Sequence, residues 1–177
     1  KHLHRLMMQS ATYQQASVGN HAAATQDPDN LLFARMNRRK LEAEALRDSL
    51  LSVAGRLDLT MGGIAFPDVN TPRRTLYLRT VRSNLNTFTQ LFDGADPTSV
   101  VPRRNQLLVS PQALFMMNNP FVITEAENLA ARFEGQTEVD GVVKNLYETL
   151  FARPVSDQEL LEARELLASL GYPGKDA

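Results

Sequence analysis

The spacing of apolar residues is the feature that most restricts how this chain can fold. Between positions 36 and 57, apolar side chains recur at intervals of three and four residues: Ala43, Leu46, Leu50, Val53 and Leu57. Such intervals place the side chains on one face of an α-helix, whereas a half-buried strand would alternate every second residue. Similar patterns return in several segments after residue 110. The chain is therefore predicted to be all-α, a helical bundle of about six to eight helices.

Start and stop signals divide this pattern into separate helices. Asp27 before Pro28 predicts an N-cap followed by proline at the first helical position. Ser156 and Glu159 have the spacing of a capping box, and Gly171 is expected to end that helix. The expected C-terminal helices are 110–118 (Ser110-Pro111 start), 120–135 (Asn119-Pro120 start, Gly135 stop), 137–150 (Thr137 cap) and 156–171. A first helix is expected over 2–13, and "QQASVGNHAAATQ" (14–26) is predicted to be a loop.

The segment "MNRRKLEAEALRDSLL" (36–51) poses a problem because cations stand near the predicted helix start, where the macrodipole favours anions. Two arrangements are compatible with the sequence. In one, Asn37 caps a new helix and Arg38, Arg39 and Lys40 occupy its first turn. In the other, one bent helix runs from Pro28 to Leu57, and the cations lie mid-helix without a dipole penalty.

Residues 58–110 interrupt the helical pattern with Gly, Pro and Asn, which are typical of loops. Within them, "TLYLRTVR" (75–82) alternates in the manner of a short strand, so one strand pair is expected at most. "LNTFTQLF" (85–92) predicts one or two helical turns. A long irregular segment inside a compact domain is frequently functional.

Composition narrows the class of protein. With 177 residues, 43% hydrophobic residues and a net charge of -1, the chain resembles one globular domain over 1–177. No apolar run approaches the roughly 18 residues that span a bilayer, so no membrane span is expected. There is no cysteine, which excludes disulfides and thiolate ligands within this chain. Because "KHLHRLMM" begins in a helical pattern without a cap, we expect a fragment of a longer protein.

Charge is distributed unevenly along the chain. Residues 35–104 carry twelve cations and seven acids, while residues 105–177 carry five cations and eleven acids. The two regions either pair with each other or leave the basic middle facing an anionic partner. Three arginine doublets could bind such an anion by bidentate contacts: Arg38 and Arg39, Arg73 and Arg74, Arg103 and Arg104. Nucleic acid is a poor fit, because the pI is near 6.4 and no stacking-aromatic motif is present.

No arrangement of residues predicts a catalytic or metal site. His2 and His4 would lie about 200° apart on a helix and cannot hold one ion from the same face. HExxH, GxGxxG, P-loop and GxSxG patterns are absent, and "QDPDN" lacks the glycine and closing glutamate of an EF-hand. No catalytic residue, no metal ligand and no cofactor in this fragment are therefore predicted.

Five segments that cover nearly the whole chain stand out: "HLHRLMMQSATYQQAS", "DPDNLLFARMNRRKLEAEALRDSLLSVAGRLD", "RRTLYL", "PRRNQLLVSPQALFMMNNPFV" and "LYETLFARPVSDQELLEA". Together, and in this order, they resemble a C-terminal domain of unknown function found in large planctomycete proteins. The sequence departs from the pattern at Ala34, where a larger residue is usual, and around Arg82.

The resemblance implies a partner and a location. Proteins of this family are exported to the periplasm or beyond, carry haem on a separate cytochrome-c-like domain, and are linked with breakdown of polysaccharides. The resemblance also identifies polar motif residues, and we expect these to form a buried ion-pair network. In this network, Arg38 and Arg39 would meet acids from elsewhere in the fold. The other expected members are Asn37, Glu42, Glu44, Arg47 and Asp48.

Three functions follow as expectations. The first is a non-catalytic helical interaction module that docks on the upstream domains of the same protein. The second is a module that binds anionic, sulfated or uronic polysaccharide through the arginine doublets. The third is part of a composite active site that the upstream domains complete.

Overall fold

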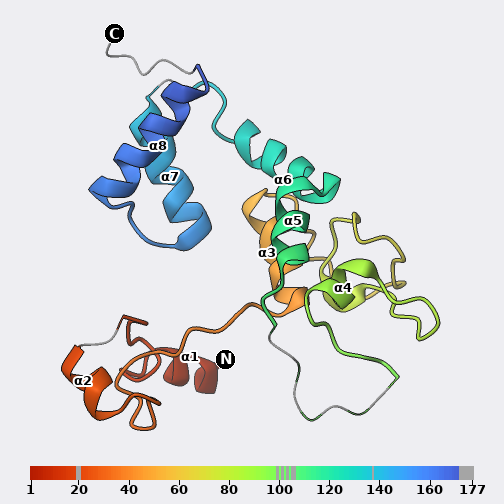
Figure 1. Cartoon of the computed structure of the whole chain (residues 1–177). Helices are drawn as coiled ribbons and strands as arrows, with labels where there is room; N and C mark the ends of the chain where they lie inside the picture. The colour runs from red at the N-terminus through yellow and green to blue at the C-terminus, as the bar shows by residue number, and fades with distance from the viewer. Residues whose placement is uncertain are drawn as a thin grey trace. The chain divides into compact units, whose positions relative to one another are not determined.

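The computed structural model describes residues 1–18, 21–98, 100, 102, 104, 107–136 and 138–171, without the side chains of residues 21 and 23. The fold is predominantly α-helical, as predicted (Figure 1). The described helices are α1 (His2–Met8), α2 (His21–Gln26), α3 (Ala43–Val53), the 3-10 helix η1 (Thr75–Tyr77), α4 (Thr87–Leu91), α5 (Ser110–Asn118), α6 (Pro120–Ala131), α7 (Val139–Phe151) and α8 (Asp157–Ser169). None of these helices is long and apolar enough to cross a membrane.

Contacts within the chain gather in two compact units, Lys1–Leu41 and Glu42–Ala177. The first unit contains α1 and α2 and long extended connections. Helix α1 ends at Met8, before the predicted end at residue 13, and α2 forms inside the segment predicted to be a loop. That loop prediction is therefore wrong over His21–Gln26, where consecutive alanines favour a helix.

Neither predicted arrangement of the basic segment occurs. Helix α3 begins at Ala43 with Glu42 in an extended conformation at its N-cap, so Arg38, Arg39 and Lys40 lie outside any helix. The Pro28 helix is also absent, because Asn30 and Phe33 both have a φ of 54° in the left-handed region, which a right-handed helix cannot include. The cations consequently face no macrodipole penalty.

The second unit is built around α3, which contacts η1, α4 and α6. Its fully or nearly buried positions are Ala43, Arg47, Leu51 and Ala54, spaced by four, four and three residues. The predicted face is correct at Ala43, whereas Leu46, Leu50, Val53 and Leu57 are only partly buried. The buried face of α3 is therefore shifted by one residue from the predicted apolar face, because Arg47 lies at the centre of the buried face.

Aromatic rings close the core on the α4 side of α3. Phe88 of α4, Phe92 at its C-cap and Phe115 of α5 form a triad with ring centroids 4.8 to 5.6 Å apart. Ala43 lies in the same cluster, and its small side chain lets α3 approach these rings. The side chain of Gln112 donates to the carbonyl of Leu91 at 2.8 Å and ties α5 to α4.

The middle segment follows the prediction of an irregular connection with short helical turns. Helix α4 confirms the turns predicted over 85–92. The strand predicted over 75–82 is wrong, since η1 occupies its start and the described residues form isolated bridges such as Phe66 with Leu78.

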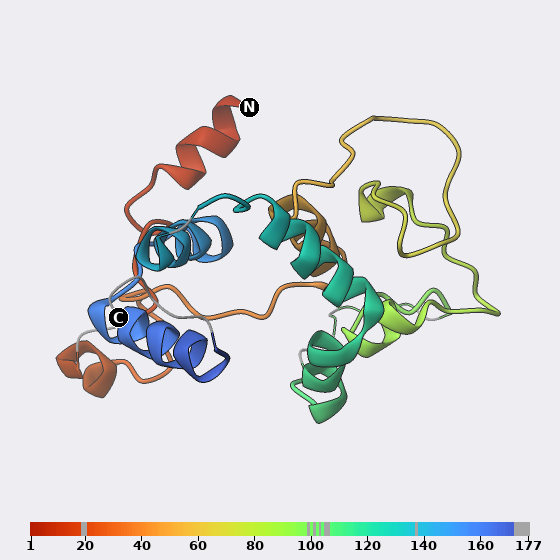
Figure 2. The ribbon, with the colours of Figure 1, turned by 90° about the horizontal axis from the view of Figure 1, so that it is seen from above.

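The C-terminal helices begin and end near the predicted residues. Asn119 caps α6 by accepting the Phe121 N–H at 3.0 Å, and Ser156 with Glu159 forms the predicted capping box of α8. Gly135 and Gly171 have φ values of 85° and 80°, as expected for residues that follow helices. The predicted cap Thr137 lies outside the described residues. Helices α7 and α8 pack side by side (Figure 2), joined by an ion pair between Asp140 and Arg164.

Candidate functional site

The predicted anion-binding arginines of the middle segment bind the protein itself. Arg73 donates to the carbonyls of Gly62 and Ile64 (3.0 Å to Ile64) and stacks on the ring of Tyr77 at 4.4 Å. Arg74 lies 3.9 Å from the carboxylate of Asp48. These contacts fold the irregular segment back on itself and leave little of Arg73 for a ligand.

The third doublet is likewise engaged where it is described. Arg104 forms a bidentate ion pair with Glu44, in which two guanidinium nitrogens lie 2.6 and 3.1 Å from the carboxylate oxygens. It also lies 3.3 Å from the carboxylate of Glu42. Burial acts to raise the pKa of Glu44, but the Arg104 guanidinium outweighs it, so that pKa lies below its ordinary value. Arg103 lies outside the described residues.

The first doublet has no such partners. Arg38 and Arg39 are exposed, and neither forms an ion pair with the described part of the chain. The expected buried network around these two arginines is therefore not found there. Asn37 instead accepts a hydrogen bond from the side chain of Asn30 at 2.9 Å.

Among the described residues, Arg47 is the arginine that is buried. Its guanidinium donates to the backbone carbonyls of Val69 at 2.8 Å, Thr71, and Arg73 at 2.9 Å. It lies between the rings of Phe66 and Phe121, 5.4 and 5.9 Å from their centroids. Burial lowers the pKa of Arg47 below its ordinary value, although the nearby Asp48 carboxylate acts in the other direction.

The carboxylate of the next residue, Asp48, adds to these contacts. We call the contacts of Arg47 and Asp48 with residues 69–75 the Arg47 clamp. Asp48 accepts the backbone N–H of Thr75 at 2.8 Å and its hydroxyl at 2.6 Å, and that hydroxyl accepts from Arg47 at 3.0 Å. Arg47 and Asp48 thus fix residues 69–75 against α3. Five well-placed donors on one planar group suit this task, which lysine could not perform.

Between the basic middle and the acidic C-terminal region, the described residues form one ion pair, Arg56 with Glu125 at 2.7 Å. The other described ion pairs lie within one region or the other. Within the described part of the chain, these ion pairs thus join charges of the same region more often than charges of different regions.

A polar framework organises residues 27–37 of the first unit. Asp27 is buried, and its carboxylate accepts the backbone N–H groups of Leu31 at 2.9 Å and Leu32 at 2.7 Å. These two bonds, the one from Leu32 first, hold the pKa of Asp27 below its ordinary range. The residue predicted to cap a helix thus caps a turn.

Asn30 supplies the second half of this framework. Its carboxamide oxygen accepts the Arg35 N–H at 3.2 Å, and its nitrogen donates to the Arg35 carbonyl at 2.7 Å. Arg35 in turn donates to the carbonyl of Pro28 at 2.7 Å. Residues 27–37 therefore form a loop whose backbone is fixed by side-chain hydrogen bonds, rather than a simple linker.

The loop directs three large apolar side chains outward. Leu31, Leu32 and Phe33, which we call the LLF loop, are 74%, 83% and 61% exposed. Phe33 is also in the left-handed region, a conformation that is strained for a bulky residue and that clusters at binding surfaces. Adjacent apolar side chains presented by a rigid backbone are typical of a protein contact surface.

The rest of the first unit has the same character. Among its described side chains, the buried ones are Asp27 and Asn30, and no apolar one is buried. In the first helix, which the sequence predicts over 2–13, the spacing places Leu3, Leu6, Met7 and Ala11 on one face, and all four residues are exposed. The sequence patterns did not identify the LLF loop, whose residues were assigned to a helix.

The described residues contain no group of three His, Asp or Glu side chains that could hold a metal ion. His2 and His4 are both exposed on α1.

These observations describe two helical units: the second contains the buried Arg47 and its carbonyl partners, and the first exposes its apolar side chains. A family model described as PSD1, a protein of unknown function (DUF1553), matches residues 1–167, and the chain belongs to this family. Comparison with curated proteins and with solved structures gave no match.

Proposed function

We propose that this chain is a non-catalytic interaction module whose contact surface is the LLF loop. The supporting observation is that Asp27 and Asn30 fix the loop backbone while Leu31, Leu32 and Phe33 stay exposed. A preorganised loop loses little conformational entropy when it binds, which favours affinity. Three such side chains are enough to form the core of an interface when they are buried by a partner, since hot spots are compact.

The partner we propose is the upstream part of the same polypeptide. The resemblance to C-terminal domains of exported planctomycete proteins supports this choice, together with the haem expected on their cytochrome-c-like domain. The partner surface should be apolar with carboxylates at its rim, because the unpaired Arg38 and Arg39 follow the loop in sequence.

Photo-cross-linking in the full-length polypeptide tests this proposal. Benzoylphenylalanine replaces Phe33 in one sample and Leu76, which is also exposed but belongs to the other unit, in a matched control. We expect cross-links from position 33 to the upstream domains and far fewer from position 76. Equal yields from the two positions would count against the LLF loop as the contact surface.

A second candidate is binding of anionic polysaccharide, which the exposed and unpaired Arg38 and Arg39 favour. Dextran sulfate serves as the probe, at low and moderate salt. Binding should weaken with salt and in an Arg38→Gln/Arg39→Gln variant, but not in Arg79→Gln/Arg82→Gln, which removes two other exposed arginines. Equal loss in both variants would exclude a site at Arg38 and Arg39.

A further inference from the structure

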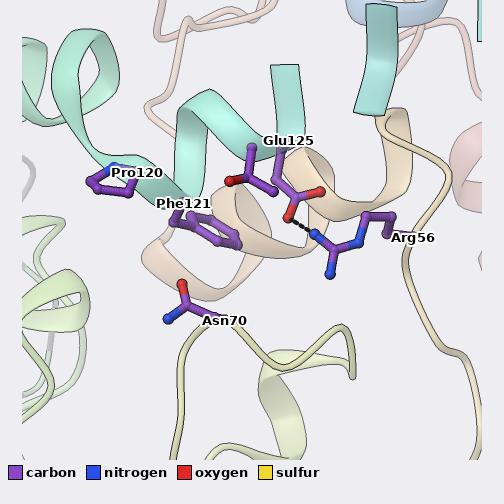
Figure 3. Close-up of a pocket in the computed structure, with 6 residues that line it drawn as sticks. Arg56, Asn70, Pro120, Phe121 and Glu125 are labelled. Atoms are coloured by element: carbon purple, nitrogen blue, oxygen red, sulfur yellow. Dashed lines mark hydrogen bonds and ion pairs between the residues drawn. The ribbon is translucent and has the colours of Figure 1, made fainter. Parts of the chain in front are cut away.

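A cavity of about 310 Å³ lies beside the Arg47 clamp in the second unit (Figure 3). Its wall combines residues just after α3, from the clamped segment and from the start of α6: Arg56, Asn70, Pro120, Phe121, Thr124 and Glu125. The two rings of Pro120 and Phe121 give an apolar side, and the other residues give a polar side. Pockets of this composition bind small molecules with a few directed polar groups.

Arg56 supplies hydrogen-bond donors to this cavity. One of its nitrogens binds Glu125, as the dashed line in Figure 3 shows, and its side chain is 34% exposed. Its other N–H groups have no partner among the described residues. A guanidinium with free N–H groups is suited to a carboxylate.

The backbone fixes Arg56 in this position. Gly55, with a φ of 77°, ends α3, and the Arg56 N–H returns to the carbonyl of Leu51 at 2.9 Å. This ending is of the Schellman type, which requires a residue tolerant of the left-handed region. The helix terminus therefore fixes the backbone from which the Arg56 side chain extends, and Glu125 holds its guanidinium.

Asn70 supplies an acceptor on the opposite wall. Arg47 binds the carbonyls on both sides of it, those of Val69 and Thr71, so the backbone at Asn70 is held. Its side-chain nitrogen donates to Asp68 at 3.0 Å. Its carboxamide oxygen is turned toward the ring of Phe121 in Figure 3 and has no partner among the described residues.

Glu125 adds a second unpaired group. The residue is 3% exposed, and its Oε2 has no hydrogen-bond partner in the described structure. Burial raises the pKa of its carboxyl, against the opposing effect of Arg56 and Arg47. The Glu125 carboxylate therefore acts at the cavity through its other oxygen, Oε1, which binds Arg56 at 2.7 Å.

We propose that this cavity binds a small hydroxycarboxylate, with its carboxylate on the free N–H groups of Arg56 and its hydroxyl on the carboxamide oxygen of Asn70. Glu125 positions the guanidinium, and the apolar side of the ligand contacts Phe121 and Pro120. The cavity and the LLF loop belong to different units, so this proposal stands or falls independently of the interaction function.

Titration with L-malate, followed by NMR of the Asn70 side-chain amide and the Thr124 backbone amide, tests this assignment. Both resonances should shift to saturation. Succinate, which differs from malate only by lacking the hydroxyl, should bind about tenfold more weakly, and glycerol should not bind. Absence of saturation with malate, or equal affinity for malate and sulfate, would overturn the proposal.

Variants separate the two contacts. Arg56→Gln should lower malate affinity about tenfold or more, while Asn70→Ala should abolish the preference for malate over succinate. Arg79→Gln, which removes an exposed arginine elsewhere in the unit, should change neither. If Arg56→Gln fails to fold, Arg56→Lys keeps the charge and should still bind malate more weakly, because lysine lacks the planar fork. Wild-type affinity in the lysine variant would contradict the role of Arg56.

Discussion

The carboxylate of Asp27 holds the backbone of Leu32: its Oδ2 accepts the Leu32 N–H at 2.7 Å, while the Leu32 side chain is almost fully exposed. A buried anion thus fixes an exposed apolar residue. In a loop that served only as a connection, there would be no reason to combine the two. The hydrogen bond to Asp27 therefore fixes the backbone of the proposed contact surface.

Removing this anion should loosen the loop. In Asp27→Ala, the backbone N–H groups of Leu31 and Leu32 lose their acceptor and should exchange with deuterium several-fold faster. Residue-resolved hydrogen exchange measures the effect. Asp29→Ala is the matched control, since Asp29 is exposed and its carboxylate makes no hydrogen bond in the described structure. Equal acceleration in both variants would show that Asp27 does not hold the loop.

Strain at Phe33 predicts opposite effects on stability and binding. Phe33→Gly removes a bulky residue from the left-handed region, so the free energy of unfolding should stay the same or rise by up to about 1 kcal/mol. Binding to the upstream domains should nevertheless weaken. Leu32→Gly, where φ is not positive, should weaken binding and lower stability. Denaturant unfolding and a binding assay separate these outcomes, and strong destabilisation by Phe33→Gly would refute the strain argument.

The Arg47 clamp should dominate the stability of the second unit. Arg47→Met keeps much of the side-chain volume but leaves the carbonyls of Val69, Thr71 and Arg73 without their donor. We expect the free energy of unfolding to fall by about 3 kcal/mol. Urea unfolding followed by circular dichroism measures this loss, with Arg79→Met, at an exposed position, as control. A loss below about 1 kcal/mol would mean that the clamp is not structural.

The cap of α8 predicts a titration at low pH. Arg153, followed by Ser156, lowers the pKa of Glu159 to about 2. Because this pKa is depressed in the folded state, the cap contributes fully above the unfolded pKa of about 4.3 and is lost as the pH falls through 2. NMR titration of the Glu159 carboxyl should show a midpoint near 2 that rises in Arg153→Gln. A midpoint near the unfolded value would contradict the observed contacts.

Helix ends were predictable where a local side chain determines them. Asn119 and the Ser156–Glu159 pair cap the helices that their spacing indicates, because capping depends on residues close in sequence. The same reasoning failed at Asp27, whose carboxylate caps a turn. A good N-cap signal does not exclude a following left-handed residue such as Asn30, which ends the helix before it begins.

The buried stripe of α3 was predicted one residue out of register for a different reason. Apolar periodicity assumes that buried positions are apolar, yet Arg47 is fully buried between two aromatic rings. Its partners are carbonyls more than twenty residues away, which no local pattern reveals. The cavity beside it likewise depends on three distant segments, so Arg56, Asn70 and Glu125 could not be associated from sequence alone.

The LLF loop was missed because three consecutive apolar residues were assigned to a helix. On a helix, such residues spread around most of the circumference and cannot share one buried face. That inconsistency was the available signal, and it favours a loop that exposes them.

Hydrogen exchange of residues 27–36, with and without the separately produced upstream domains that we propose as the partner, tests the central claim most directly. We predict that the backbone N–H groups of Leu31, Leu32 and Phe33 exchange more slowly in the complex, while those of η1 in the second unit do not change. Unchanged exchange across the LLF loop, in a sample where the two parts are shown to associate, would contradict the account.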